Sequence, residues 1–293
     1  MAILTGINTQ LRGSAGGWTF AQLGGETIAK QKVAKKSTAK RTMAVMRRRV
    51  QMGNLVNVFR SFAGTLHPSF EGKSAKVTDY NEFMGANFGL VPVYLTKTEA
   101  RGNGAVVAAY QITRGSMPTI EHDSETPGKV TTDIALGDLT IDGDTTVADF
   151  SRAVVQNNED YAYGDQISVY VMQQMVNSDS HVPIVRTKAY EVTLSVEDEE
   201  DLLATHIPII YAATSDGKLG NSMAVTGGIC YVHSRKTGSG TKVSTQRLVV
   251  NNSVLASYQS RAALDKAVQS YGGLTGDQFL TPDVEDVVAP VRP

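Results

Sequence analysis

The residue types that carry catalytic chemistry are present, but their spacing does not bring them together. The single cysteine, Cys230, precedes His233 by three positions in the segment CYVHS, which has the character of a strand. Side chains three positions apart in a strand point to opposite faces of the sheet, so this thiol and this imidazole do not meet. A nucleophile needs a base within hydrogen-bond distance. We therefore interpret Cys230 as a small buried residue and His233 as a surface residue.

The side chains that ligate metals also lack a binding pattern. The five histidines are dispersed, and none has the spacing of a zinc site. In IDGDTTVAD (141–149), the residues Asp142, Asp144 and Asp149 approach a calcium loop, but its full spacing and terminal glutamate are missing. We interpret this segment as a turn. The sequence predicts no catalytic residue, no metal site, no cofactor and no enzymatic activity.

The segment LRGSAGGWTFAQLGGETIAKQKV (11–33) holds the only tryptophan of the chain, Trp18, among glycines. These glycines do not form a phosphate-binding GxGxxG loop, because a strand and not a helix follows them. The alternation of residues predicts a β-hairpin with its turn at Leu23-Gly24-Gly25. Glycines let another backbone approach closely. We interpret Trp18 as an anchor for a neighbouring chain, with packing on its own sheet as the alternative.

Charge is distributed unevenly along the chain. Residues 1–64 contain eleven Lys and Arg and one Glu, although the whole chain contains 28 basic and 29 acidic residues. A basic N-terminal segment therefore precedes an acidic body. The basic segment is open to three interpretations: docking on acidic protein surface, a solvated helix face, or binding of nucleic acid. We favour docking, in which copies of the chain pair the arm of one with the body of the next.

A helix is predicted from an N-cap at Ser37-Thr38 to about Phe62, because apolar residues recur every three to four positions. His67-Pro68 would end it. The predicted contact residues of the arm lie in the hairpin and this helix: Trp18, Phe20, Arg47, Arg48, Arg49, Phe59 and Phe62. The aromatic residues would be buried anchors in an interface, and the arginines would pair with acids such as those of EDEED (197–201).

The rest of the chain is predicted to be mainly β. Short strand-like segments are bounded by turn residues, as in an antiparallel, Ig-like sandwich. They are GAVVAAYQITRG (104–115), TTDIALGDLTIDG (131–143), SRAVVQ (151–156), DQISVYVMQQMV (165–176) and RTKAYEVTLSV (186–196). Asp216-Gly217 and residues 237–240 read as hairpin turns, DYNEFMGANFG as a short helix and residues 253–273 as a helix.

Four regions follow from this pattern: a hairpin-helix assembly arm (1–66), a connector (67–90), a β-sandwich domain (91–200), and a second β-rich region with a C-terminal helix and an acidic tail (201–293).

No apolar run is long enough to span a membrane, and we see no signal peptide. The lone cysteine forms no internal disulfide, which is typical of a reducing compartment.

The glycine-rich start with GGWTF, the GGETI turn, the basic run into STAKRTMAVMRRRVQMGNLVNVFRSF, and the later segments YAYGDQISVYVM and GGICYVHSRKTGSGTKVSTQRLVV together resemble an uncharacterised family that is widespread in Bacteroidetes genomes and their phages. The approach to the helix, KKSTAKRT, departs from the Asn- and Pro-rich segment of that family. The resemblance implies a virion component of a Bacteroides phage, of the crAss-like group, and no activity.

We therefore expect a structural virion protein, made in the bacterial cytoplasm. It would assemble as a homo-oligomeric ring in the neck or tail of a tailed phage and contact other virion proteins. The alternatives are a capsid auxiliary or decoration protein, and a DNA-facing protein that binds nucleic acid. A glycan-binding module would need exposed aromatic residues on the body, and the only tryptophan lies in the arm.

Overall fold

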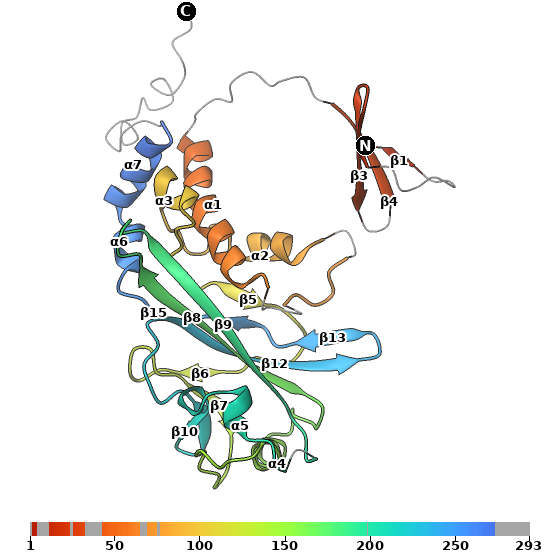
Figure 1. Ribbon diagram of the computed structural model, residues 1–293, viewed down its shortest axis with the longest axis vertical. Helices are drawn as coiled ribbons and strands as arrows, with labels where there is room; N and C mark the ends of the chain where they lie inside the picture. Colours follow the sequence, from red (N-terminus) through yellow and green to blue (C-terminus); the bar gives the residue numbers. More distant parts are fainter. Residues whose placement is uncertain are drawn as a thin grey trace, which may run out of the picture.

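The computed structural model describes residues 2–4, 12–23, 26–32, 43–64, 69–74, 77–197 and 199–272. Within these residues, more of the chain lies in strands than in helices, and the strand pairs that build the sheets are antiparallel. The prediction of a mainly β chain is confirmed. An Ig-like sandwich is not confirmed, because a single long sheet lies at the centre, with helices on one side of it and a helix with short strands on the other (Figure 1).

Three long strands make the central sheet. They are β8 (Gln166–Val176), β9 (Pro183–Thr193) and β12 (Gly227–Thr237). Two shorter strands, β13 (Gly240–Val243) and β15 (Val249–Asn251), pair with β12, and the strand order is β13-β12-β8-β9. The strands predicted at 165–176 and 186–196 are confirmed, and so is the turn between β12 and β13. Because β8 and β12 are largely apolar in their middle parts, these two strands are expected to be covered on both faces.

Both faces of β8 and β12 are indeed buried, each under its own core. Val171 and Tyr231 belong to one apolar cluster, and their neighbours Met172 and Cys230 belong to the other. Side chains alternate along a strand, so one strand supplies both cores. The sheet therefore joins the two halves of the body.

Helices cover the face that carries Cys230. They are α1 (Met43–Phe62), α2 (Asp79–Asn87), α3 (Lys97–Arg101), α6 (Leu255–Gln259) and α7 (Arg261–Ser270), beside a small sheet of β5 (Gln111–Thr113) and β14 (Gln246–Arg247). The helix predicted to end near Phe62 and the short helix in DYNEFMGANFG are confirmed, whereas the helix predicted at 253–273 is divided into α6 and α7, because Ser260 has extended backbone and caps α7. The predicted N-cap at Ser37-Thr38 and the stop at His67-Pro68 lie outside the described residues. No helix in the described part of the chain combines the length and apolar character needed to cross a bilayer.

The opposite face of the sheet is covered by α4, by short helices and by a second sheet. The elements are β6 (His122–Asp123), β7 (Thr131–Ala135), α4 (Val147–Asn157), α5 (Leu203–His206), the 3-10 helix η1 (Ile209–Tyr211), β10 (Ala213–Ser215) and β11 (Lys218–Gly220). The turn at Asp216-Gly217 joins β10 and β11 as predicted. The strand predicted at 151–156 is wrong: Thr146 caps a helix there, and Val147, Phe150 and Val154 bury its apolar side.

The apolar run at 104–108 is buried but is not a strand, contrary to the prediction for 104–115, of which only β5 is a strand. The run packs over the face of the central sheet that carries Met172 and Cys230, in the same apolar core, and so it does not extend the sheet at an edge. Side-chain amides take the place of a partner strand. Asn54 bonds both the N–H and the C=O of Val106 (2.7 and 3.0 Å), and the Gln174 side chain accepts from the N–H of Val107 (2.9 Å). These buried backbone groups are thereby satisfied.

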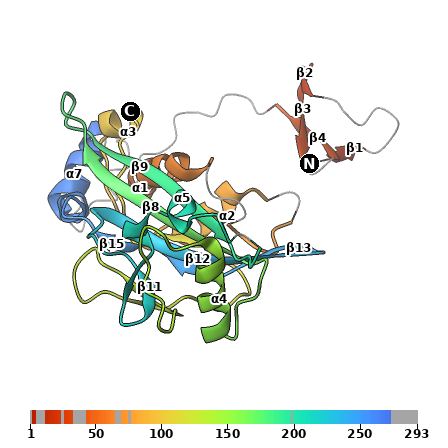
Figure 2. The same cartoon turned by 60° about the horizontal axis from the view of Figure 1, so that its bottom comes forward.

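The N-terminal residues form a separate four-stranded sheet in the order β1-β4-β3-β2. Its strands are β1 (Ala2–Leu4), β2 (Gly13–Ala15), β3 (Trp18–Leu23) and β4 (Glu26–Gln31). The predicted hairpin of 11–33 is confirmed in β3 and β4, with Gly24 and Gly25 outside the described residues. In two views this sheet lies apart from the body (Figures 1 and 2). We call it the N-terminal sheet.

Gly227 provides a test of how tightly the central strands are packed. It has φ +130°, and a Cβ at this position would lie 2.0 Å from the carbonyl oxygen of Met172. We expect Gly227→Ala to lower the free energy of unfolding by about 3 kcal/mol or more, because the strain and the clash fall on backbone. Gly238→Ala, in open space in the β12–β13 turn, should change it by less than about 1 kcal/mol. Urea unfolding measures both, and equal effects would contradict the packing described here.

Candidate functional site

The predicted contact residues of the hairpin lie on one face of the N-terminal sheet. Trp18 is opposite Ala15 and Gln31, and Phe20 is two positions along the same strand, so both side chains share a face. The Trp18 side chain is 46% exposed, and Phe20 is half-buried. A tryptophan that exposes this much of its ring is available as an interface anchor.

The helical part of the predicted arm is packed into the body. Phe62 is fully buried, and Phe59 and Phe62 form edge-on ring contacts 5.3 Å apart and both contact Phe83 of α2. Phe62 is therefore a core residue of this chain and Phe59 packs, half-buried, against the same core, so the expectation that they are interface anchors is corrected. Helix α1 buries them because its apolar positions fall on more than one side. Arg47, Arg48 and Arg49 are exposed, as expected for contact residues.

A buried ionic cluster, which the sequence analysis missed, lies at the start of β8. The carboxylate of Asp165 is only 2% exposed and accepts from Nε2 of His233 (2.8 Å) and from Nε and Nη2 of Arg235 (2.6 and 2.7 Å). The backbone N–H of Ala162 also donates to it (2.9 Å). The ring of Tyr161 stacks on His233, with centroids 4.0 Å apart. The cluster thus ties the loop before β8 to the middle of β12.

Burial and hydrogen bonding set the protonation states in this cluster. Burial alone would raise the pKa of Asp165, but the hydrogen bonds from Arg235 and His233 outweigh it and hold that pKa below its usual value. Burial lowers the pKa of His233, and this exceeds the opposite effect of its hydrogen bond to Asp165. The folded state at neutral pH therefore contains an ionised Asp165, a charged Arg235 and a neutral His233 that donates Nε2–H.

This histidine–carboxylate pair resembles half of a hydrolytic triad, but its location gives it no substrate. The His233 side chain is 1% exposed, and neither it nor Asp165 lines any of the three cavities described for the body. The prediction that His233 is a surface residue is wrong, because β12 is covered on both faces. The prediction for Cys230 is confirmed: it is buried in the other core, and burial raises the pKa of its thiol. The cluster has the location expected of a structural contact that holds the loop before β8 against β12.

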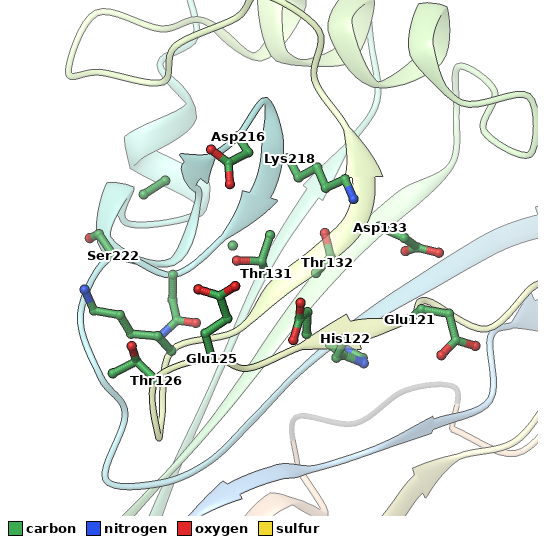
Figure 3. A pocket seen from close by; sticks show the side chains of 15 residues that line it. Glu121, His122, Glu125, Thr126, Thr131, Thr132, Asp133, Asp216, Lys218 and Ser222 are labelled. Atoms are coloured by element: carbon green, nitrogen blue, oxygen red, sulfur yellow. The ribbon is translucent and has the colours of Figure 1, made fainter.

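A cavity of about 630 Å³ is lined by residues of the four-stranded sheet β10-β11-β7-β6 and of its loops (Figure 3). Carboxylates dominate its lining, which includes Glu121, Asp123, Glu125, Asp133, Asp216, Lys129 and Lys218. His122 also lines it, with Nε2 buried and without a hydrogen-bond partner, and burial lowers the pKa of this imidazole although Asp133 opposes the effect. We call this hollow the acidic cavity. Its excess of carboxylates over lysines makes it an electrostatic match for basic groups.

The other predicted acidic segments are explained by local contacts. Asp142 accepts from the N–H of Asp144 and from Thr145, both at 3.0 Å, which confirms the turn interpretation. In the EDEED segment, Glu199 pairs with Arg152 and Asp201 with His206. No group of three or more potential metal ligands occurs within the described residues.

Comparison with family models, with curated proteins and with solved structures gave no match for this chain. The function is therefore argued from the arrangement of the residues described above.

The buried histidine predicts a pH dependence of stability. Since the pKa of His233 is lowered in the folded state, the unfolded chain binds a proton first as the pH falls. The stability that the neutral imidazole contributes is thus fully present above about pH 6.5 and is lost as the pH falls from there through the lowered value. His122 acts in the same direction. We expect His233→Gln to flatten the fall in the free energy of unfolding below about pH 6.5.

Urea unfolding at several pH values measures this dependence. His181→Gln, at an exposed histidine, is the control and should keep the slope of the parent protein. A slope that His233→Gln leaves unchanged would show that His233 is not held neutral by burial.

Proposed function

We propose that this protein is a structural subunit of a tailed phage particle, which assembles as a multi-copy ring in the neck or tail through its N-terminal sheet. The observation that carries the proposal is that this sheet lies apart from the body and exposes Trp18 (Figure 1). A small four-stranded sheet becomes more stable when its exposed aromatic side chain packs on another surface.

Charge complementarity indicates that the N-terminal sheet of one copy binds the body of another copy. Lys30 and Lys32 are exposed at the end of β4, and the segment that follows them is strongly basic. The body is acidic, and its carboxylates gather at the acidic cavity. Opposite charges on the two parts of one chain favour association of the N-terminal sheet of one copy with the body of the next. Such a head-to-tail contact generates a ring where the rotation closes.

The structure changes which part of the chain can act as the arm. Helix α1 contacts α2, α3, α7 and β9, so it belongs to the body. The assembly arm of the proposal is therefore the N-terminal sheet together with the segment that joins it to α1. The phage context rests on the resemblance of the sequence to the Bacteroidetes phage family, and a capsid auxiliary protein would use the same arm.

Self-association provides the test of this proposal. We expect Trp18→Ala to weaken self-association at low salt at least about tenfold, because central tryptophans of interfaces carry much of the binding energy. Tyr163→Ala is the matched control, since Tyr163 on the body is 47% exposed and Trp18 is 46% exposed. Light scattering at low and high salt measures the mass. Removal of residues 1–36 should leave a monomer, and a truncated chain that still assembles would refute the arm.

The second candidate function is binding of nucleic acid, and the three exposed arginines of α1 favour it. Arg47, Arg48 and Arg49 are exposed and could neutralise phosphates. If they do, replacing all three by Ala should reduce the slope of log affinity for duplex DNA against log salt by about three.

Filter binding across a salt series measures this slope. Arg186→Ala with Lys188→Ala and Lys236→Ala removes the same charge from exposed positions elsewhere on the body. An equal loss in both triple variants would indicate attraction by net charge alone, and no loss in either would remove this candidate.

A further inference from the structure

One side of α1 is exposed and combines basic with apolar residues. Val45, Arg48, Arg49 and Met52 are spaced three and four positions apart, which places them on one side of the helix. Both arginines are exposed, and Val45 and Met52 are each 36% exposed. We call these four residues the α1 stripe. Met46 and Val50, on the other side of the helix, are fully buried against α7.

The described chain ends beside this helix. Leu264, Ala267 and Val268 of α7 pack on Met46 and Val50. A Cβ at Gly53 of α1 would lie 3.6 Å from the hydroxyl of Tyr271, and Gly53 is one turn from Arg49. The residues that follow Gly272 therefore start next to α1, and Figure 1 shows α7 and α1 side by side at one end of the body.

The chemistry of the following segment complements the α1 stripe. The sequence DQFLTPDVEDVV (277–288) interleaves carboxylates with apolar residues. Seven extended residues span up to roughly 24 Å, so Phe279 is within reach from Gly272. Along α1, the distance from Gly53 back to Val45 is only about 12 Å. A connected segment is also held at a high effective concentration.

We propose that residues 277–288 of the same chain dock on the α1 stripe. The carboxylates of Asp283, Glu285 and Asp286 face Arg48 and Arg49, and apolar side chains such as Phe279 cover Val45 and Met52. This intramolecular contact goes beyond the proposed assembly function, which uses the N-terminal sheet. It also covers two of the three arginines that a nucleic acid would need.

A second basic surface on the body is the alternative that the test must separate. A groove of about 390 Å³ along β8 and β9 is lined by Arg186, Lys188, Tyr190, Tyr211 and Met223, among others. It also pairs positive charge with apolar surface. The α1 stripe is favoured because α7 delivers the segment to it, whereas no described element leads the segment to this groove.

The experiment places a fluorescent reporter in the segment. In the full chain, Trp18→Phe removes the only tryptophan, and Phe279→Trp introduces a single new one. If the segment is docked, the emission lies at shorter wavelength than that of the same chain unfolded in urea, and it is unaffected by dilution. The charge reversals Arg48→Glu with Arg49→Glu should shift it to the unfolded position. Circular dichroism verifies that each variant is folded.

The matched control is Arg186→Glu with Lys188→Glu, which reverses the same charge in the groove and should leave the emission unchanged. The proposal is overturned by an emission that equals that of the unfolded chain from the start. It is also overturned if the groove reversal, and not the reversal in α1, releases the segment. An emission that changes with dilution would place the segment on another copy and likewise contradict an intramolecular contact.

Discussion

The body depends on one constraint: the strands β8 and β12 must be covered on both faces. Their side chains alternate between two separate apolar clusters, one on each face of the sheet. Removing the elements that cover either face would therefore expose the same two strands. Desolvating a sheet on both faces stabilises the fold by burial but leaves no tolerance for polar groups without partners. Asp165, Asn54 and Gln174 are among the polar side chains buried there, and each is hydrogen-bonded.

Short-range residue patterns predicted the hairpins, turns and helices that depend on neighbouring residues. The alternation around Trp18, the turn at Asp216-Gly217 and the three-to-four spacing in α1 each correspond to an observed element. The failures concern short apolar runs. Residues 151–156 are too few to separate a helix from a strand, and the capping Thr146 lies outside that window. Residues 104–108 were apolar enough for a strand, but they lie in the core over one face of the central sheet rather than along one of its edges.

The exposure of the predicted contact residues differs between the arginines and the aromatic residues of α1. Arg47, Arg48 and Arg49 are exposed as expected for arginines, whereas Phe62 is buried and Phe59 half-buried in the core that α1, α2 and the central sheet form. No short-range pattern predicts the Asp165 cluster, because Arg235 lies 70 positions after Asp165 in the sequence. Its members do lie in two segments: YAYGDQ, which leads into β8, and CYVHSR, which belongs to β12. A charge at a buried position in or beside a strand requires a partner, and that requirement is the signal that could have found the cluster.

The packing of α1 against α7 has a consequence for biosynthesis. Helix α1 is made first, but its buried side needs α7 and the central sheet, whose last strands follow residue 226. During translation, the apolar side chains of α1 therefore leave the ribosome long before their partners exist. Most of the chain, up to Ser270, must emerge before the helical side of the body can close, so its folding is late and governed by contacts between distant parts of the sequence. Until then the nascent chain exposes Phe62 and its neighbours, and it depends on protection from premature association.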